Sequence, residues 1–215
     1  MTPRAVMKTR TNRPYAQRMA PQERRRQVLN AAIAQISEQG YAMVTIQAIA
    51  TRVGVTRPVV YSVFANVDEL LLTLLDYLQV RTLADVVKAV HTGGEGPDAV
   101  IRNSMDEFLR SIEASPADWR VLLQTDDSAA PDEVRRRCRR GRANVTAMLA
   151  ETLTASLTEV PADFDAEMLA EAVVTLAHRC GTLMLENPER YPLERMRAMV
   201  EGLAISVSDL AATGG

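Results

Sequence analysis

Residues 54–64, GVTRPVVYSVF, constrain the fold of this chain more than any other stretch. Their valines and aromatic residues are typical of a strand, but Pro58 stands in the middle. If Thr56 is the N-cap of a helix, Pro58 falls in the first turn, where its missing N–H needs no partner. A helix then collects four apolar residues on one face: Val60, Val63, Phe64 and Val67. The spacing therefore predicts a helix over residues 56–64.

The residues before this helix have the spacing of a helix-turn-helix. Two helices joined by a short turn need a small residue where they approach and a residue that accepts positive φ in the turn. They also need an apolar residue that plugs the second helix. Ala50, Gly54 and Val60 can fill these roles in that order. The second helix is then the one placed to enter a DNA major groove.

Helical periodicity with proline boundaries continues through the chain. A first helix follows Pro21 and ends at Gly40, a second begins at the N-cap Thr45, and a long one runs from its cap Asp68 to about residue 89. Further helices are expected at 98–114, 117–125, 131–157, 165–186 and 192–212. The chain is therefore predicted to be all-α. It divides into a flexible arm (residues 1–20), a three-helix unit (21–67) and a larger helical body (68–215).

Cysteine usage and motif content narrow the function classes. Cys138 and Cys180 lie far apart without a CxxC pair, which argues against a zinc knuckle or a disulfide framework and suits a reducing cytoplasm. No HExxH or ExxH pattern occurs, so we expect no metal and no cofactor. The longest uncharged stretch, residues 39–51, is too short and too polar to span a membrane, and no signal peptide is expected.

Positive charge is concentrated at the N-terminus. Residues 1–26 hold eight basic residues and one acidic residue, whereas the rest of the chain holds 17 basic and 26 acidic residues. This asymmetry points to a polyanionic partner at one end of the molecule. A solvated, disordered tail is the other interpretation of such an arm.

The combined order of these motifs resembles the DNA-binding region of TetR-family transcriptional regulators. The run TIQAIATRVGVTRPVVYSVFANVDELLLTLL, preceded by EQGY, carries the resemblance over residues 22–76. It implies an N-terminal helix-turn-helix domain and a C-terminal helical domain for ligand binding and dimerisation. The implied function is that of a repressor, released from a palindromic operator in double-stranded DNA by a small apolar effector.

The resemblance assigns DNA contacts to individual residues. Thr45 and Tyr61 match positions that usually contact phosphates, and Arg57 matches a position that often reaches bases or backbone. The remaining groove-facing positions are Thr56, Pro58, Val59 and Ser62.

One departure from the family pattern bears on the arm. Val67 stands where the family often has a lysine that contacts phosphate, and valine cannot make this contact. The arm is therefore expected to supply phosphate contacts, with Arg10 or Arg13 in the adjacent minor groove.

The family encloses an inducer cavity in its larger domain and dimerises through its last two long helices. The resemblance places seven residues at such a cavity: Tyr77, Met105, Phe108, Trp119, Leu122, His178 and Met184. It also implies a homodimer through helices 165–186 and 192–212. Small residues that would permit close contact at the seam are Ala177, Gly181, Gly202 and Ala204.

The run RRRCRRGR, residues 135–142, has two interpretations. On a helix, an inward stripe would hold Val134, Cys138, Gly141, Val145 and Met148, which leaves the arginines on solvated sides next to upstream carboxylates. The other interpretation is an anion clamp at the mouth of a pocket that takes an acidic ligand.

A second class of function stays open from the sequence. The chain could be a helical small-molecule-binding protein, or an enzyme, whose N-terminal unit is only structural. The missing catalytic constellation favours the regulator over this alternative.

Overall fold

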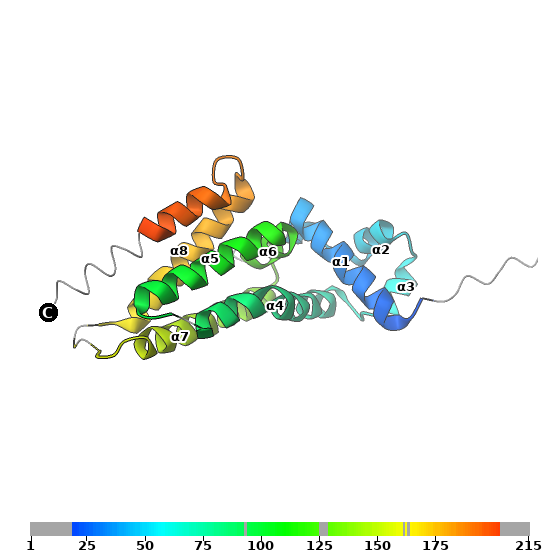
Figure 1. The fold of residues 1–215 in the computed structure, drawn as a ribbon. Helices are drawn as coiled ribbons and strands as arrows, with labels where there is room; N and C mark the ends of the chain where they lie inside the picture. The colour runs from blue at the N-terminus through cyan, green and yellow to red at the C-terminus, as the bar shows by residue number, and fades with distance from the viewer. Residues whose placement is uncertain (1–18, 93, 125–128, 161, 163, 203–215) are drawn as a thin grey trace, which may run out of the picture.

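A computed structural model describes residues 19–92, 94–124, 129–160, 162 and 164–202. These residues form an all-α protein, as predicted, and contain no strand. Figure 1 shows α1, α2 and α3 at one end of an elongated molecule, with α4 running from there into the helical body. The helices are α1 (Pro21–Gln39), the 3₁₀ turn η1 (Tyr41–Met43), α2 (Ile46–Val53), α3 (Arg57–Tyr61), α4 (Val67–Thr92), α5 (Pro97–Ala114), α6 (Pro116–Leu123), α7 (Asp132–Ala155) and α8 (Ala166–Glu186).

Local signals set most of the helix ends. Gly40 ends α1 with a φ of 80° and donates its N–H to the Ile36 carbonyl at 2.8 Å. The Thr45 hydroxyl accepts a hydrogen bond from the Ala48 N–H at 3.0 Å and caps α2, as predicted. Gly54 ends α2 in the left-handed region, with φ 74° and ψ 34°, and makes the turn between α2 and α3 possible.

Two predicted boundaries near α3 are wrong. The helix ends at Tyr61 rather than at residue 64, because the Val60 carbonyl accepts from both the Val63 and Phe64 N–H groups in a tightened turn. The cap of α4 is Asn66 rather than Asp68. The Asn66 side chain accepts from the Glu69 N–H at 2.8 Å, and the Glu69 carboxylate accepts from the Ala65 N–H at 2.6 Å.

The remaining helices lie close to their predicted ranges. Prolines occupy the first positions of α5 and α6, and the Asp165 carboxylate caps α8 through the Met168 N–H. A further helical segment begins at residue 193 and continues to residue 202. The rest of the predicted helix at 192–212 lies outside the described residues.

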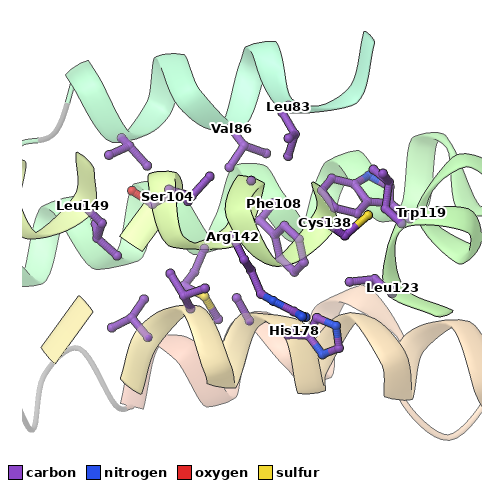
Figure 2. Close-up of a pocket in the computed structure, with 18 of the residues that line it drawn as sticks. Leu83, Val86, Ser104, Phe108, Trp119, Leu123, Cys138, Arg142, Leu149 and His178 are labelled. Atoms are coloured by element: carbon purple, nitrogen blue, oxygen red, sulfur yellow. The ribbon is translucent and has the colours of Figure 1, made fainter. Parts of the chain in front are cut away.

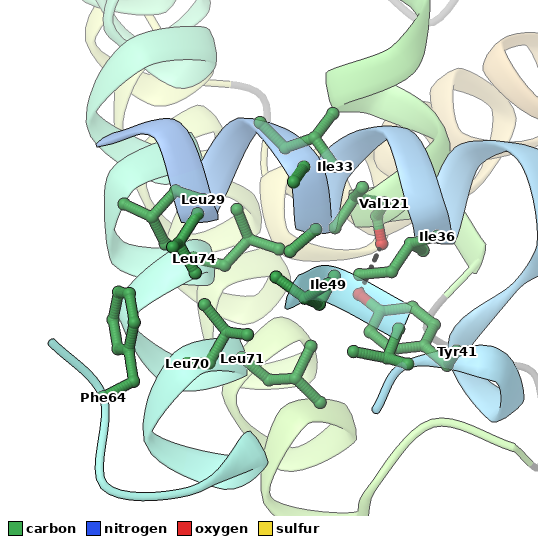
Figure 3. Close-up of a cluster of buried hydrophobic side chains, with 14 of the residues drawn as sticks. Leu29, Ile33, Ile36, Tyr41, Ile49, Phe64, Leu70, Leu71, Leu74 and Val121 are labelled. Atoms are coloured by element: carbon green, nitrogen blue, oxygen red, sulfur yellow. Dashed lines mark hydrogen bonds between the residues drawn. The ribbon is translucent and has the colours of Figure 1, made fainter. Parts of the chain in front are cut away.

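The molecule has two hydrophobic cores, and α4 contributes residues to both. The first core joins α1, α2 and α3 to the beginning of α4, with Leu70, Leu71, Leu74, Leu75 and Leu78 buried there (Figure 3). It also takes in Val121 of α6 and Val134 of α7. The second core fills the helical body and includes Val86 and Val90 from the far end of α4.

A buried hydrogen bond joins the N-terminal unit to α6. The Tyr41 hydroxyl donates to the Val121 carbonyl at 2.8 Å, and Figure 3 shows this bond beside Ile36 and Ile49. Carbonyls in the last turn of a helix have no partner within that helix, so Tyr41 satisfies one that is buried. Burial raises the pKa of the Tyr41 phenol, so the phenol remains a donor.

Gly181 brings α8 close to α5 and α6. A Cβ at this position would lie 2.8 Å from the Cδ1 atoms of both Ile112 and Leu123. The prediction that Gly181 lies at a dimer seam is therefore wrong, because it is buried against its own chain. Met196 and Val200, in the segment 193–202, are also buried within the second core. Ala204 lies outside the described residues.

Among the described residues, α8 alone is long and apolar enough to cross a membrane by length and composition. Core helices of globular proteins pass the same test, so this is weak evidence for a membrane span. Only 28% of its apolar stretch is buried within the protomer. Much of the helix surface therefore remains available for contact outside the protomer.

Replacing Tyr41 with phenylalanine tests the link between the two parts of the fold. Tyr41→Phe leaves the Val121 carbonyl buried without its donor, which should lower the free energy of unfolding by about 1–3 kcal/mol. Urea unfolding at fixed protein concentration measures this change. The exposed Tyr61 provides the control, because Tyr61→Phe should change stability by less than about 0.5 kcal/mol. Equal effects of the two changes would contradict a structural role for the bond.

Candidate DNA interface and ligand cavity

The exposed face of α3 carries most of the residues predicted to contact DNA. Thr56, Arg57, Pro58, Tyr61 and Ser62 are exposed, Val59 is half-buried, and Val60 anchors the opposite side in the first core. The Arg57 guanidinium lies 5.9 Å from the centre of the Tyr61 ring. These side chains form one surface that a polyanion can reach.

The hydroxyl groups near this face differ in which hydrogen bonds they can still make with a ligand. The Ser62 hydroxyl donates to the Val59 carbonyl at 2.7 Å, so only its acceptor capacity remains for a ligand. Thr45 is exposed, and its hydroxyl hydrogen is free to donate because the oxygen acts as acceptor in the α2 cap. Thr56 precedes α3 and makes no side-chain capping bond.

Arg25 of α1 fixes the segment that follows α3. Its guanidinium donates to the Val63 carbonyl at 2.6 Å and to the Thr73 hydroxyl at 3.1 Å. It also lies 4.2 Å from the centre of the Phe64 ring and 3.6 Å from the Glu69 carboxylate. One cation thus holds α1, the end of α3 and the first turns of α4 together.

Arg52 holds α2 against α1 in a comparable way. Its guanidinium forms a two-point ion pair with the Glu38 carboxylate, with distances of 2.9 and 2.5 Å, and donates to the Gln35 amide at 3.2 Å. The hydrogen bonds from Arg52 lower the pKa of Glu38 below its usual value. The framework around α3 is therefore fastened by two arginines that face neighbouring helices.

An apolar cavity lies in the helical body, between α4, α5, α6, α7 and α8. Its empty space, counted together with open solvent at its mouth, is about 880 Å³. Figure 2 shows the side chains that line it. They are Gln79, Leu83, Val86, Val90, Ser104, Met105, Phe108, Trp119, Leu122, Leu123, Cys138, Gly141, Arg142, Val145, Leu149, Val173, Val174, Ala177 and His178.

An ion pair between a buried carboxylate and an exposed arginine lies next to the cavity and joins α4 to α6. The Arg81 guanidinium lies 3.2 Å from the Asp118 carboxylate, which is 4% exposed. Burial raises the pKa of Asp118, and the charge of Arg81 partly opposes this rise. Asp118 directly precedes Trp119, so the ion pair fixes α6 at the cavity wall.

Comparisons with known proteins agree with this architecture. Residues 28–74 match the sequence profile of the bacterial regulatory proteins of the tetR family, and residues 97–206 match a tetracyclin repressor-like C-terminal domain. The chain belongs to the TetR family. Members of this family are transcriptional regulators that bind DNA, which removes the enzyme alternative.

Solved structures share the TetR fold at low sequence identity. A TetR-like transcriptional regulator from Rhodococcus sp. RHA1 is 20% identical, with a TM-score of 0.72 over 87% of this chain and 96% of that chain. A TetR transcription regulator from Haloarcula marismortui ATCC 43049 is 24% identical, with a TM-score of 0.66 over 86% and 98%. A SmeT–triclosan complex is 18% identical, with a TM-score of 0.69 over 86% and 90%.

The TetR-type cavity includes five of the seven residues predicted to line it: Met105, Phe108, Trp119, Leu122 and His178. Tyr77 and Met184 do not line it. The Tyr77 hydroxyl accepts a hydrogen bond from Arg81 at 3.1 Å, and Met184 packs in the second core. Both residues have the size and polarity of lining residues, but neither faces the empty space.

Of the two interpretations of the run 135–142, the solvated face holds for Arg135 and Arg136, which pair with Asp132 and Glu133, and Arg137 pairs with Asp76 of α4. Arg142 instead lines the cavity, the position that the anion-clamp interpretation requires. The signal for Arg142 was present in the spacing. It follows Cys138 by four residues and precedes Val145 by three, so the three share a helix face.

Arg10 and Arg13 lie outside the described residues. Within the described part of the chain, no group of three His, Cys, Asp or Glu side chains is placed to hold a metal ion.

Arg25 and its neighbour Arg26 provide a matched test of the framework around the recognition helix. Arg25→Met keeps an unbranched apolar stem but removes the donors to Val63 and Thr73, and should lower the free energy of unfolding by about 1–3 kcal/mol. Arg26 is exposed, so Arg26→Met should change it by less than about 0.5 kcal/mol. Chemical denaturation followed by circular dichroism measures both. Similar losses in the two variants would contradict the role assigned to Arg25.

Proposed function

We propose that this regulator is a ligand-responsive repressor that binds a palindromic operator as a homodimer and is released by a small effector in the cavity. The proposal rests on two separate features of one chain. One is the exposed face of α3, and the other is the apolar cavity in the helical body, lined by α4 to α8. DNA and effector then bind at separate sites, and each can alter the affinity for the other.

In this proposal α3 enters the major groove of double-stranded DNA. Arg57 contacts a base edge or the backbone, with guanine the best match for its two parallel donors. Tyr61 and Thr45 donate to phosphates, and Thr56, Pro58, Val59 and Ser62 face the groove. Arg10 and Arg13 of the arm add minor-groove contacts, since Val67 supplies none to phosphate.

The effector occupies the cavity between α4 and α8. The apolar lining favours an apolar body, and the edge-to-face pair of Phe108 and Trp119, with ring centres 4.9 Å apart, forms part of the wall. The Trp119 Nε1–H is buried and has no acceptor among the described residues. A ligand acceptor that reached this N–H would recover the cost of about 1–3 kcal/mol for a buried unsatisfied donor.

Helix α6 is the proposed route from the cavity to the DNA-binding unit. Trp119 and Leu122 line the cavity, the Val121 carbonyl between them binds Tyr41, and Asp118 pairs with Arg81 of α4. An effector acts only through its difference in affinity for the DNA-bound and released states. A shift of α6 would change its contacts to the N-terminal unit and to α4 together. The DNA-bound state and the released state would then have cavities of different shape.

The homodimer is proposed to form through α8 and the segment that begins at residue 193. Leu169, Leu176 and Leu183 recur every seven residues along α8, where they are half-buried, and Met168 beside them is 66% exposed. A two-fold axis through this surface would present two α3 helices to successive major grooves, about 34 Å apart. With DNA as its partner, the regulator is proposed to act in the cytoplasm.

DNA binding is tested through Arg57 and Tyr61. The operator is first recovered by selection from a random-sequence DNA pool, and an inverted repeat is expected. Arg57→Ala should weaken operator binding by about 1–3 kcal/mol, roughly ten- to a hundredfold in Kd, and relax the preference at one position in each half-site. Tyr61→Phe should weaken binding by about 1 kcal/mol on all sequences, because a phosphate contact carries no base information.

The control for this experiment is Arg110→Ala, which removes an exposed arginine of α5 outside the DNA-binding unit. Fluorescence anisotropy with labelled operator measures all three variants at the same salt concentration. If Arg57→Ala binds as wild type, or if all three variants weaken equally, α3 is not the recognition helix.

The dimer proposal is tested at the centre of α8. Leu176→Glu places a charge in the apolar stripe and should give monomers at micromolar concentration in sedimentation velocity, where the wild type sediments as a dimer. The same variant should bind a full operator at least about tenfold more weakly, since only one half-site is engaged at a time.

Asn144→Glu is the matched change on the exposed side of α7 and should leave the dimer intact. Circular dichroism confirms that both variants keep their helices. A wild type that sediments as a monomer, or a Leu176→Glu variant that stays dimeric, contradicts this interface.

A further inference from the structure

The wall of the cavity has one charged position in an otherwise mostly apolar surface. Among the described residues that line it, Arg142 is the only Arg, Lys, Asp or Glu, and the wall therefore contains no carboxylate. Guanidinium groups remain charged at all pH values that proteins tolerate. In an apolar surrounding, the attraction between such a charge and an anion is stronger than in water.

Other polar side chains lie close to Arg142. Figure 2 shows the Arg142 side chain running across the cavity toward the imidazole of His178 on α8. Gln79 of α4 also lines the cavity and lies against Gly141, the residue before Arg142, because its Nε2 would be 3.1 Å from a Cβ at Gly141. The wall thus holds three nitrogen-bearing side chains from α4, α7 and α8, of which Arg142 and His178 approach each other.

The remaining lining residues define the rest of the ligand. Phe108, Trp119, Leu123 and Leu149 present apolar surface, and Ser104 already donates its hydroxyl to the Val100 carbonyl at 2.7 Å. A ligand body that fills this space therefore gains from being apolar. The wall favours a molecule with one polar, negatively charged end.

We propose that the effector is an amphipathic monocarboxylate, whose carboxylate binds Arg142 with His178 beside it and whose apolar body fills the cavity. The planar guanidinium offers two parallel donors that match the two carboxylate oxygens. A single cation matches a single negative charge, whereas a phosphate monoester would bring a second charge into a wall with no further fixed cation. This inference rests on the proposed function, since it names the chemistry of the effector.

Trp119 allows the proposal to be tested without a label. It is the only tryptophan of the chain and lines the cavity, so its fluorescence reports on the site. The full-length protein is titrated with sodium decanoate, 1-decanol, decyltrimethylammonium and decyl phosphate. Decanoate should bind most tightly, and octanoate and laurate extend the series to find the best chain length.

Substitutions at Arg142 distinguish recognition of the ligand's head group from recognition of its apolar body. Arg142→Gln should weaken decanoate binding about tenfold or more and leave decanol binding within about twofold. Arg142→Lys keeps the charge without the two parallel donors and should lose less than Arg142→Gln. The matched control is Arg139→Gln, on the exposed side of the same run, which should change neither ligand. Thermal unfolding of each variant confirms that it is folded.

Several outcomes would overturn the proposal. Tighter binding of decyl phosphate would identify a phosphate head group, and equal binding of decanol or the ammonium would show that charge is not recognised. Unchanged decanoate binding by Arg142→Gln would remove Arg142 from the site. Lack of binding by all carboxylates from octanoate to laurate would also reject the assignment.

The same titrations on operator-bound protein distinguish this proposal from the proposed function. Release of DNA by decanoate, lost in Arg142→Gln, supports both. Release by decanol but not by decanoate rejects the carboxylate and leaves the ligand-responsive repressor standing. If the ligand-free protein selects no operator at all, the proposed function itself fails.

Discussion

The apolar face of α4 belongs to both cores, and the position of the recognition helix depends on this sharing. Leu70, Leu74 and Leu78 pack under the N-terminal unit, while Val86 and Val90 pack in the helical body. With 26 residues at about 1.5 Å per residue, α4 is one continuous helix about 39 Å long that reaches both cores. A tilt at its cavity end therefore changes the geometry at its other end, where Arg25 ties it to the end of α3.

Two turns of α6 make the other contacts that join the cavity wall to α4 and to the N-terminal unit. Asp118 binds Arg81 of α4, Trp119 lines the cavity, and the Val121 carbonyl accepts from Tyr41 of the N-terminal unit. The hydrogen bond and the Asp118 carboxylate of the ion pair are buried, so breaking either contact leaves a buried polar group without its partner. The contacts made by α6 therefore favour discrete arrangements over a continuous range of positions.

Features of the fold and the site that depend on neighbouring residues could be predicted from the sequence, whereas features that depend on residues far apart in the chain could not. Gly40, Thr45 and Gly54 act on their own neighbours, so the ends of α1 and α2 follow from residue type and spacing. The end of α3 at Tyr61 does not, because it is a tightened turn at the Val60 carbonyl, followed by a Val63 carbonyl that Arg25, 38 residues earlier in the chain, holds by a hydrogen bond. For the run 135–142 the sequence left two interpretations open, because a charged residue in a basic run is usually solvated, whereas the spacing of Arg142 from Cys138 puts it on the inward face. For Tyr77 and Met184, size and polarity cannot distinguish a side chain that faces a void from one that packs against a neighbouring helix.

Gly181 affects the cavity without lining it. A methyl group there would press on Phe108 and Leu123, with its carbon 3.2 Å and 2.8 Å from the ends of those side chains. Both residues form the cavity wall, so the added volume would push them into the empty space. The largest ligand that this regulator can accept is thus limited by a residue behind the wall, and a change of a single hydrogen to a methyl group would narrow its range of effectors.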